Sequence, residues 1–283
     1  MANRLSSPDD PRAMWEAAAP GWVKWEGVIA AGFADATERL LDMAGVRQAM
    51  RVLDVACGGG SQSVAAARRV GPGGEVLATD ISPAMLEHVR RRAAREGLGH
   101  IHTLESAAEE FDRGLPPFDA AICRLGLMLF PSPPRALDAI RRALAPGARF
   151  AALVFTTPAR NGFLAQPMAT LLRHAGKAPP GPGTPGLFAL GSPGALEAQM
   201  AGAGFTAIET RTVEARLRLP SARDALRLLQ EAAPPFRAAA AALDDAAKDK
   251  AWAEVLAGFR SFESHGALEA PLEALITAGA TPR

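Results

Sequence analysis

Two carboxylates and a glycine cluster mark the part of the chain that could do chemistry. In the stretch VLDVACGGG (52–60), Asp54 stands inside an apolar run, and Gly58 and Gly60 follow it. A buried carboxylate without a partner is costly, so Asp54 requires a partner in the fold or in a ligand. Glycines after such a run permit a tight turn and a close approach of ligand to backbone. Asp80 ends the next apolar run, where a carboxylate can accept both hydroxyls of a ribose. This spacing predicts a site for a nucleoside-containing cofactor.

The glycine loop alone fits either a nicotinamide dinucleotide or S-adenosylmethionine. The dinucleotide fingerprint needs a third glycine, and Ser63 occupies that position. A pyrophosphate would also be repelled by Asp54, whereas a cationic amino-acid ligand would be attracted. We therefore favour S-adenosylmethionine as the cofactor. A nicotinamide-dependent oxidoreductase is the alternative.

Short apolar runs alternate with amphipathic helical patterns from residue 51 onwards, which indicates a parallel sheet with helices on both faces. The predicted strands are 51–56, 75–80, 101–106, 118–124, 149–155, 205–219 and 271–280. The fold class is therefore α/β, a Rossmann-like, doubly wound and mostly parallel seven-stranded sheet. Ligands of such sheets bind at the carboxyl ends of the strands, so the glycine loop and Asp80 should meet at that edge.

The pattern divides the chain into regions, with N-terminal helices and a helical insertion before the last strand. They are an N-terminal helical cap (1–48), a cofactor-binding core (49–220), a helical lid insertion (221–265) and a closing strand of the core (266–283). Within the cap, Pro20-Gly21 is expected to separate two helices. Within the core, the Pro- and Gly-rich segment 157–190 is expected to be a long excursion over the site.

Four stretches carry a family resemblance when they are taken in order. They are VLDVACGGG, GEVLATDISPAMLE, FDAAICRLGLMLFPSPPRAL and RRALAPGARFA. The series resembles class I S-adenosylmethionine-dependent methyltransferases, in particular the ubiquinone/menaquinone biosynthesis-like branch and bacterial natural-product methyltransferases. The resemblance is strong over residues 48–156 and weak elsewhere. It implies transfer of a methyl group from S-adenosylmethionine to a small-molecule acceptor, with S-adenosylhomocysteine as product.

The resemblance also implies a set of cofactor-binding residues, namely Asp54, Ala56, Gly58, Gly60, Asp80, Ile81, Met85, Ser106, Ala107, Arg124 and Leu125. The acid and the glycine loop would hold the methionine part, Asp80 the ribose, and Ile81 and Met85 the adenine. Ser106 stands where such enzymes often have an Asp that bonds the adenine amino group. The backbone amide of Ala107 is therefore expected to contribute more to binding the adenine. The backbone after the fourth strand would lie beside the sulfonium, and the Arg124 side chain need not contact anything there.

Methyl transfer from a sulfonium is an in-line displacement, so the protein contributes mainly alignment and exclusion of water. For that reason no catalytic residue is identified. A base is needed only when the acceptor must lose a proton, and His174 is then the best-placed of the five histidines. A protein that binds the cofactor without transferring a methyl group is therefore a further alternative. No cluster has metal-ligand spacing, so we expect no metal.

Substrate selection is expected from apolar residues outside the core motifs, which suggests a largely apolar acceptor: Met128, Phe130, Phe163, Phe188 and Phe236. Trp22 and Trp25 could close over the cofactor or anchor the N-terminal helices, and both interpretations stay open. The acceptor atom, the substrate and the oligomeric state are not specified by the sequence.

Bulk properties exclude several classes of function. The formal charge is +1 with acids and bases interspersed, which argues against a nucleic-acid partner. No apolar run is long enough to span a membrane, and the polar start does not resemble a signal peptide, so we expect a cytoplasmic protein. The two cysteines, Cys57 and Cys123, cannot form a disulfide framework or a zinc site alone.

Overall fold

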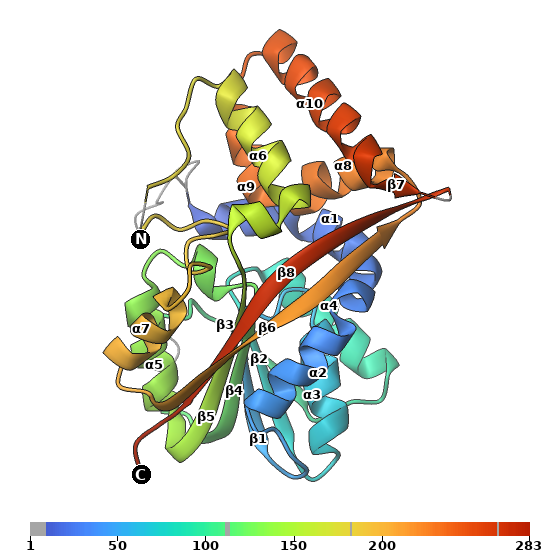
Figure 1. The fold of residues 1–283 in the computed structure, drawn as a ribbon. Helices are drawn as coiled ribbons and strands as arrows, with labels where there is room; N and C mark the ends of the chain where they lie inside the picture. Colours follow the sequence, from blue (N-terminus) through green and yellow to red (C-terminus); the bar gives the residue numbers. More distant parts are fainter. Residues whose placement is uncertain (1–9, 111–113, 182, 265) are drawn as a thin grey trace, which may run out of the picture.

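A computed structural model describes residues 10–110, 114–181, 183–264 and 266–283. Its centre is one sheet with the strand order β3-β2-β1-β4-β5-β8-β6 (Figure 1). The strands are β1 (Arg51–Val55), β2 (Glu75–Asp80), β3 (Ile101–Glu105), β4 (Phe118–Arg124), β5 (Leu144–Phe155), β6 (Thr206–Leu219) and β8 (Ala267–Ala280). The first five pair in parallel, and β8 runs antiparallel to both β5 and β6. The predicted α/β, doubly wound fold is confirmed. A two-residue strand, β7 (Glu263–Ser264), pairs with β8 and makes an eighth strand in the sheet.

The apolar strands become buried because helices cover both faces of the sheet. One face is covered by α2 (Ala34–Met43), α3 (Ser61–Val70) and α4 (Pro83–Arg95), and the other by α5 (Pro133–Ala143) and α7 (Ala195–Gly202) (Figure 1). The strand order reverses between β1 and β4, which is the point where doubly wound sheets open a crevice for ligands. The fold therefore directs attention to the carboxyl ends of β1, β2 and β4.

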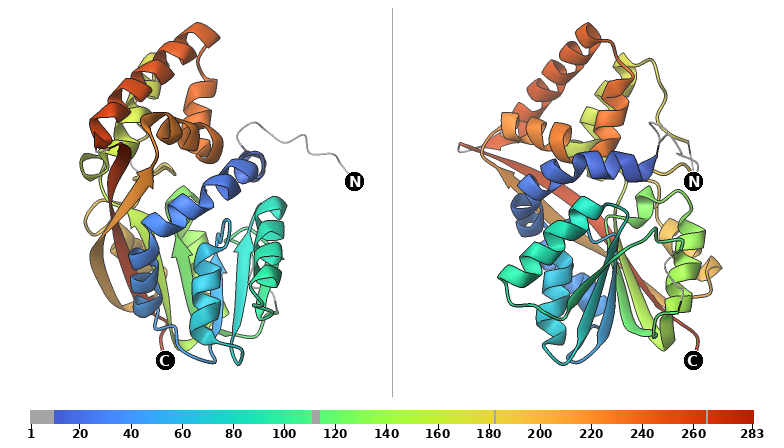
Figure 2. Two further views of the ribbon diagram at one scale, coloured as in Figure 1. Left: turned by 90° about the vertical axis from the view of Figure 1, so that its right-hand side faces the viewer. Right: turned by 180° about the vertical axis from the view of Figure 1, so that it is seen from behind.

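A group of helices stands above that edge, carried by the long strands β6 and β8 (Figures 1 and 2). It consists of α6 (Gly162–His174), α8 (Ala222–Ala232), α9 (Pro234–Ala241) and α10 (Asp245–Phe259), and we call it the upper helices. Phe163 of α6 stacks on Phe259 of α10 with ring centroids 4.8 Å apart, and both rings are buried. The upper helices thus have an apolar centre of their own.

The segment 157–190 differs from the expected long excursion because α6 occupies much of it. Phe163, Leu164 and Leu171 recur at helical spacing and are buried, so this stretch gains a packed helix. Only the part after His174, which is rich in Pro and Gly, lacks a long helix or strand among the described residues. The composition of the segment as a whole concealed the helical pattern in its first half.

The expected break at Pro20-Gly21 is wrong, because α1 (Pro11–Gly32) runs through both residues as one helix. Gly21 is needed there for packing, since a Cβ at that position would lie 2.1 Å from the carbonyl oxygen of Glu231 in α8. The helix instead ends at Gly32, and Phe33 alone separates it from α2. Figure 2 shows α1 lying between the sheet and the upper helices. Among the described residues, no helix is both long and apolar enough to cross a membrane.

Candidate functional site

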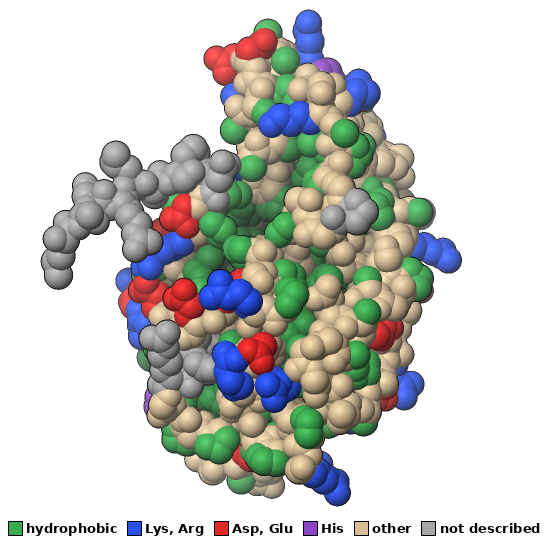
Figure 3. Space-filling view, turned by 90° about the vertical axis from the view of Figure 1, so that its left-hand side faces the viewer, with side chains coloured by type: hydrophobic (Ala, Val, Ile, Leu, Met, Phe, Trp, Pro, Cys, Tyr) green, Lys and Arg blue, Asp and Glu red, His purple; other side chains and the backbone are tan. Residues whose placement is uncertain are grey.

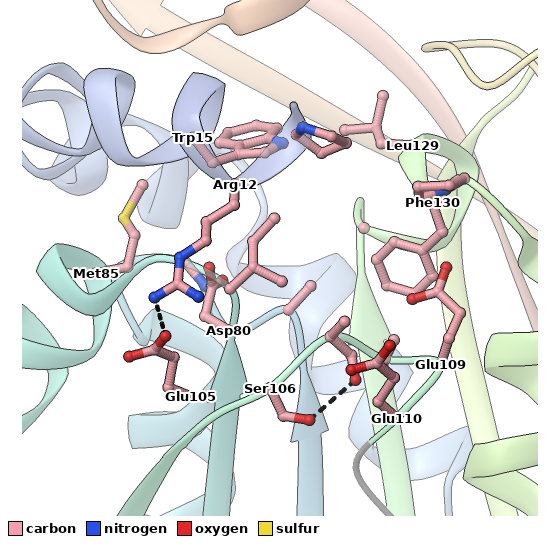
Figure 4. A pocket seen from close by; sticks show the side chains of 18 of the residues that line it. Arg12, Trp15, Asp80, Met85, Glu105, Ser106, Glu109, Glu110, Leu129 and Phe130 are labelled. Atoms are coloured by element: carbon pink, nitrogen blue, oxygen red, sulfur yellow. Dashed lines mark hydrogen bonds and ion pairs between the residues drawn. The ribbon is translucent and has the colours of Figure 1, made fainter. Parts of the chain in front are cut away.

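A cavity of about 480 Å³ opens where β1, β2 and β4 end. It is lined from below by the loops that follow these strands and from above by the first half of α1 (Figure 4). The space-filling view shows a hollow between the upper helices and the sheet, with hydrophobic side chains inside and charged side chains on its lower rim (Figure 3). Nine of the eleven expected cofactor residues line the cavity: Ala56, Gly58, Asp80, Ile81, Met85, Ser106, Ala107, Arg124 and Leu125.

Two backbone amides hold the side chain of Asp80 at the cavity wall. Its Oδ2 accepts a hydrogen bond from the amide of Gly58 at 2.9 Å, and its Oδ1 accepts one from the amide of Ser82 at 3.0 Å. Burial raises the pKa of Asp80, and these two amides oppose that rise. Each carboxylate oxygen keeps acceptor capacity beyond these bonds. The carboxylate is therefore fixed in one orientation and can still accept hydrogen bonds from the hydroxyls of a ligand.

The glycine loop owes its shape to residues with positive φ. Gly58 has φ +53° and Gly60 has φ +83°, and Ala56 adopts φ +55° although it carries a Cβ. A Cβ at Gly58 would lie 3.0 Å from Nε1 of Trp22, so this glycine keeps the space beneath the indole open. A Cβ on Gly60 would instead meet Val89 of α4 at 2.7 Å. Gly60 therefore serves helix packing, which explains why it does not line the cavity.

Asp54 lies behind the glycine loop and is fully buried away from the cavity wall. Its carboxyl accepts hydrogen bonds from Oγ of Ser63 at 2.5 Å and from Nε2 of Gln62 at 3.4 Å. Burial raises the pKa of Asp54 to about 7, against the lowering by Ser63, Arg124 and Gln62. The partner that the sequence required is thus found in the first turn of α3. In this position the side chain can hold the loop without touching a ligand.

The opposite end of the cavity is lined by Ile81, Met85 and the loop after β3. The hydroxyl of Ser106 donates to the carbonyl of Ala107 at 3.0 Å, so its proton is already engaged (Figure 4). Glu105 pairs with Arg12 of α1 across the mouth of the cavity. Ile81 and Met85 give this end an apolar surface that suits a purine base, and the carboxylates of Glu105, Glu109 and Glu110 line it as well (Figure 4).

The sequence indicated Trp22 as a candidate cover of the cofactor but missed the residues before it that line this cavity. Asp10, Arg12 and Trp15 line it, and Trp15 packs edge-on against Trp22 with ring centroids 5.6 Å apart. Glu16 of the same helix accepts hydrogen bonds from Oγ of Ser82 and the amide of Ala84 at the start of α4. The seven-residue interval between the two tryptophans was a usable signal, because it places them on one face of a helix.

The two N-terminal tryptophans lie in different surroundings. Trp22 lines the cavity, whereas Trp25 is buried and donates from Nε1 to Glu231 of α8 at 2.7 Å. Lys24 also bonds Glu231, so this part of α1 is fastened to the upper helices. One indole thus covers the cavity and the other anchors the helix.

His174 is not placed to act as a base in this cavity. It ends α6, and its Nε2 lies 3.1 Å from Oε2 of Glu254 on α10. His88 lies 2.8 Å from Glu26, and His100 contacts the carbonyl of Ala67. Among the described residues that line the cavity, none is a histidine, and the described chain holds no group of three metal-ligating side chains.

The apolar residues expected to select a substrate separate into two groups. Phe130 lines the cavity together with Leu129, whereas Phe163 and Phe236 are fully buried among the upper helices. Met128 is buried as well and does not line the cavity. Phe188 is partly buried against the core and is not part of the cavity wall either.

Comparison with known proteins identifies the family of this chain. The model of a family described as "Methyltransferase domain" matches residues 52–147, which include the glycine loop and Asp80. The nocamycin O-methyltransferase of Saccharothrix syringae is 30% identical over 235 residues, covering 75% of this chain and 82% of that protein. The chain belongs to the S-adenosylmethionine-dependent methyltransferases. A ubiquinone/menaquinone biosynthesis C-methyltransferase of Idiomarina loihiensis is 36% identical over 119 residues, covering 42% of this chain and about half of that protein (47%).

A solved structure agrees on the fold. The cyclase SpnF superposes with a TM-score of 0.62 at 17% identity, covering 97% of this chain and 96% of SpnF. This likeness extends the shared architecture to the upper helices as well as the sheet. The expected methyltransferase family and its cofactor class are thus confirmed. Nothing in these comparisons supports the nicotinamide-dependent alternative.

Proposed function

We propose that this protein transfers a methyl group from S-adenosylmethionine to a small, largely apolar acceptor and releases S-adenosylhomocysteine. The observation that carries the proposal is the buried Asp80, held by the amides of Gly58 and Ser82 at the cavity wall. A carboxylate in this position, at the end of the second strand, suits the two ribose hydroxyls of a nucleoside. Membership of the methyltransferase family supports the same cofactor.

In this proposal, different residues of the cavity bind different parts of the cofactor. The backbone of Ala56 and Gly58 lies against the methionine part, and Ile81 and Met85 pack on the adenine. The amide of Ala107 replaces a side-chain contact to the purine, because the hydroxyl of Ser106 bonds elsewhere. The backbone of Arg124 and Leu125 lies beside the sulfonium. Asp54 and Gly60 shape the loop from behind.

The sulfonium group of the cofactor supplies a methyl that is already activated for displacement. The protein therefore has to align the acceptor and to exclude water. Trp15, Trp22, Leu129 and Phe130 give the cavity an apolar wall on the side of α1 and the loop after β4. Such a wall suits an acceptor with a large apolar surface, because moving apolar surface from water into an apolar cavity is favourable in free energy. Alignment by packing needs no histidine or metal.

The test is incubation with methyl-labelled S-adenosylmethionine and a panel of low-polarity phenols, hydroxyquinones and nitrogen heterocycles, followed by a metabolite extract. We expect a labelled product and an equal amount of S-adenosylhomocysteine from at least one acceptor. Asp80→Asn should lower kcat/KM for the cofactor. Cofactor binding without labelled product from the panel or the extract would overturn methyl transfer and favour a cofactor-binding protein without it.

The same proposal covers location and partners. Cys57 and Cys123 are free and buried, which fits a reducing compartment, so we expect a cytoplasmic enzyme. The balanced charge of the chain supports a small-molecule partner rather than a nucleic acid. We further propose that residues 1–48 and 221–265 act with α6 as the cover of the site, and that 49–220 and 266–283 form the core.

A further inference from the structure

Arg124 carries a buried positive charge without an ion-pair partner. The side chain is 8% exposed, ends β4 and lines the cavity. Its Nη1 donates to Oγ1 of Thr37 at 2.9 Å, and its Nη2 donates to Oγ of Ser61 at 2.6 Å. Both partners are neutral hydroxyls. Burying a guanidinium among neutral groups is costly, so the arrangement calls for an anion.

No side chain among the described residues supplies that anion at contact distance. Arg124 takes part in none of the ion pairs within 4.0 Å that the described residues form. Asp54 and, more weakly, Glu26 act on it electrostatically, but the carboxyl of Asp54 is bonded to Ser63 and Gln62, and Glu26 pairs with Arg92 and His88. Burial raises the pKa of Asp54 to about 7, so it carries only part of a negative charge near neutral pH. A guanidinium has five N–H donors, and most of those on Arg124 are free for a ligand.

The start of α3 lies beside the guanidinium, although the residues of its first turn do not line the cavity. The ten-residue helix begins at Ser61, and its cap residue Gly60 provides no side-chain hydrogen bond. Because Ser61 also bonds Arg124, the guanidinium and the start of α3 lie side by side.

Arg124 lies across β1 from Asp80, since the strand order is β2-β1-β4. Two strand spacings separate the ends of β2 and β4, which is about 10 Å. A ligand whose ribose is held by Asp80 and whose chain passes over the loop at Gly58 would therefore end near Arg124. The methionine part of S-adenosylmethionine ends in a carboxylate, the single anionic group of that molecule.

We propose that the Arg124 side chain binds the carboxylate of the methionine part of the cofactor. This inference rests on the proposed function and adds a role for the side chain at a position where the family resemblance implied a role for the backbone alone. Arg124 thereby distinguishes the full cofactor from nucleoside fragments that lack the amino acid. Thr37 and Ser61 keep the guanidinium in place, and Asp54 holds the loop through Ser63 and Gln62.

The test compares two ligands and uses calorimetry on the full chain. S-adenosylhomocysteine has the amino-acid part, whereas 5′-methylthioadenosine has the same thioether nucleoside without it. Arg124→Gln should weaken S-adenosylhomocysteine about ten- to hundredfold, the range for hydrogen bonds to a charged group, and should change 5′-methylthioadenosine less than twofold. Arg124→Lys should retain part of the affinity. Asp80→Asn, the matched control, should weaken both ligands, because both contain the ribose.

A second comparison does not depend on any variant folding. In the wild-type protein, decarboxylated S-adenosylhomocysteine should bind about ten- to hundredfold more weakly than the parent compound. Equal affinity of these two ligands, or an Arg124→Gln loss that is the same for S-adenosylhomocysteine and 5′-methylthioadenosine, overturns the assignment of Arg124. A wild-type protein that binds neither S-adenosylhomocysteine nor the fragment overturns the proposed function instead.

Discussion

Replacing Asp54 with Asn should stabilise the protein at neutral and alkaline pH, although it removes a carboxylate from the centre of the cofactor loop. Asp54 is fully buried, and burial raises the pKa of its carboxyl from 3.8 to about 7. The folded protein therefore binds this proton more tightly than the unfolded chain. Between these two pKa values the unfolded chain releases the proton and the folded protein keeps it, so the free energy of unfolding falls as pH rises through this window.

The size of the effect follows from the interval between the two pKa values. An interval of about three pH units corresponds to about 4 kcal/mol of lost stability, fully reached above pH 7 and absent below pH 4. Asn is nearly the same size and can still accept the hydrogen bond from Ser63, but it does not titrate. The stability of Asp54→Asn relative to wild type should therefore rise from near zero at pH 4 to about 4 kcal/mol at pH 8.

The assay is urea unfolding of the ligand-free protein at several pH values from 4 to 8, with the m-value checked at each. Asp249→Asn, on the exposed surface of α10, controls for the loss of one negative charge from the chain. Burial also raises the pKa of Asp80, so a part of the falling slope should persist in the variant. Parallel curves for wild type and Asp54→Asn would refute the reasoning.

The remaining predictions concern α1. Gly21→Ala should destabilise the protein by several kcal/mol in urea unfolding, because its Cβ would lie 2.1 Å from the Glu231 carbonyl. Gly27→Ala in the same helix meets nothing within 4 Å and should stabilise by up to about 1 kcal/mol, and the opposite order would contradict this account of packing. Trp22→Ala should speed release of S-adenosylhomocysteine in stopped-flow measurements, because the indole covers Gly58. Unchanged release would show that Trp22 does not cover the ligand.

The sequence predicted the sheet and most of the cavity wall because both follow from local patterns. Apolar runs and glycine turns identify strands, and the doubly wound topology brings their carboxyl ends together without further information. Asp80 could be placed correctly for that reason. Asp54 and Gly60 lie in the same motif, yet they face α3 and α4 rather than the cavity. A sequence motif alone does not show which of its residues face the cavity.

Features that depend on contacts distant in sequence were not predictable in the same way. Pro20 and Gly21 resemble a helix break, but α1 continues because α8 packs closely against it at Gly21. Arg12 reaches Glu105 across the mouth of the cavity, a pairing that no local pattern records. A ligand-binding role for the charge of Arg124 could likewise be inferred only from the structure, which shows that its partners, Thr37 and Ser61, are neutral.

The measurement that tests the central claim most directly is a calorimetric titration of S-adenosylmethionine into the wild-type protein and into Asp80→Asn. We expect one binding site per chain in the wild type and at least about thirtyfold weaker binding in the variant, because a charged acceptor for two hydroxyls is lost. Equal affinity in the two proteins, or no binding to the wild type, would contradict the account.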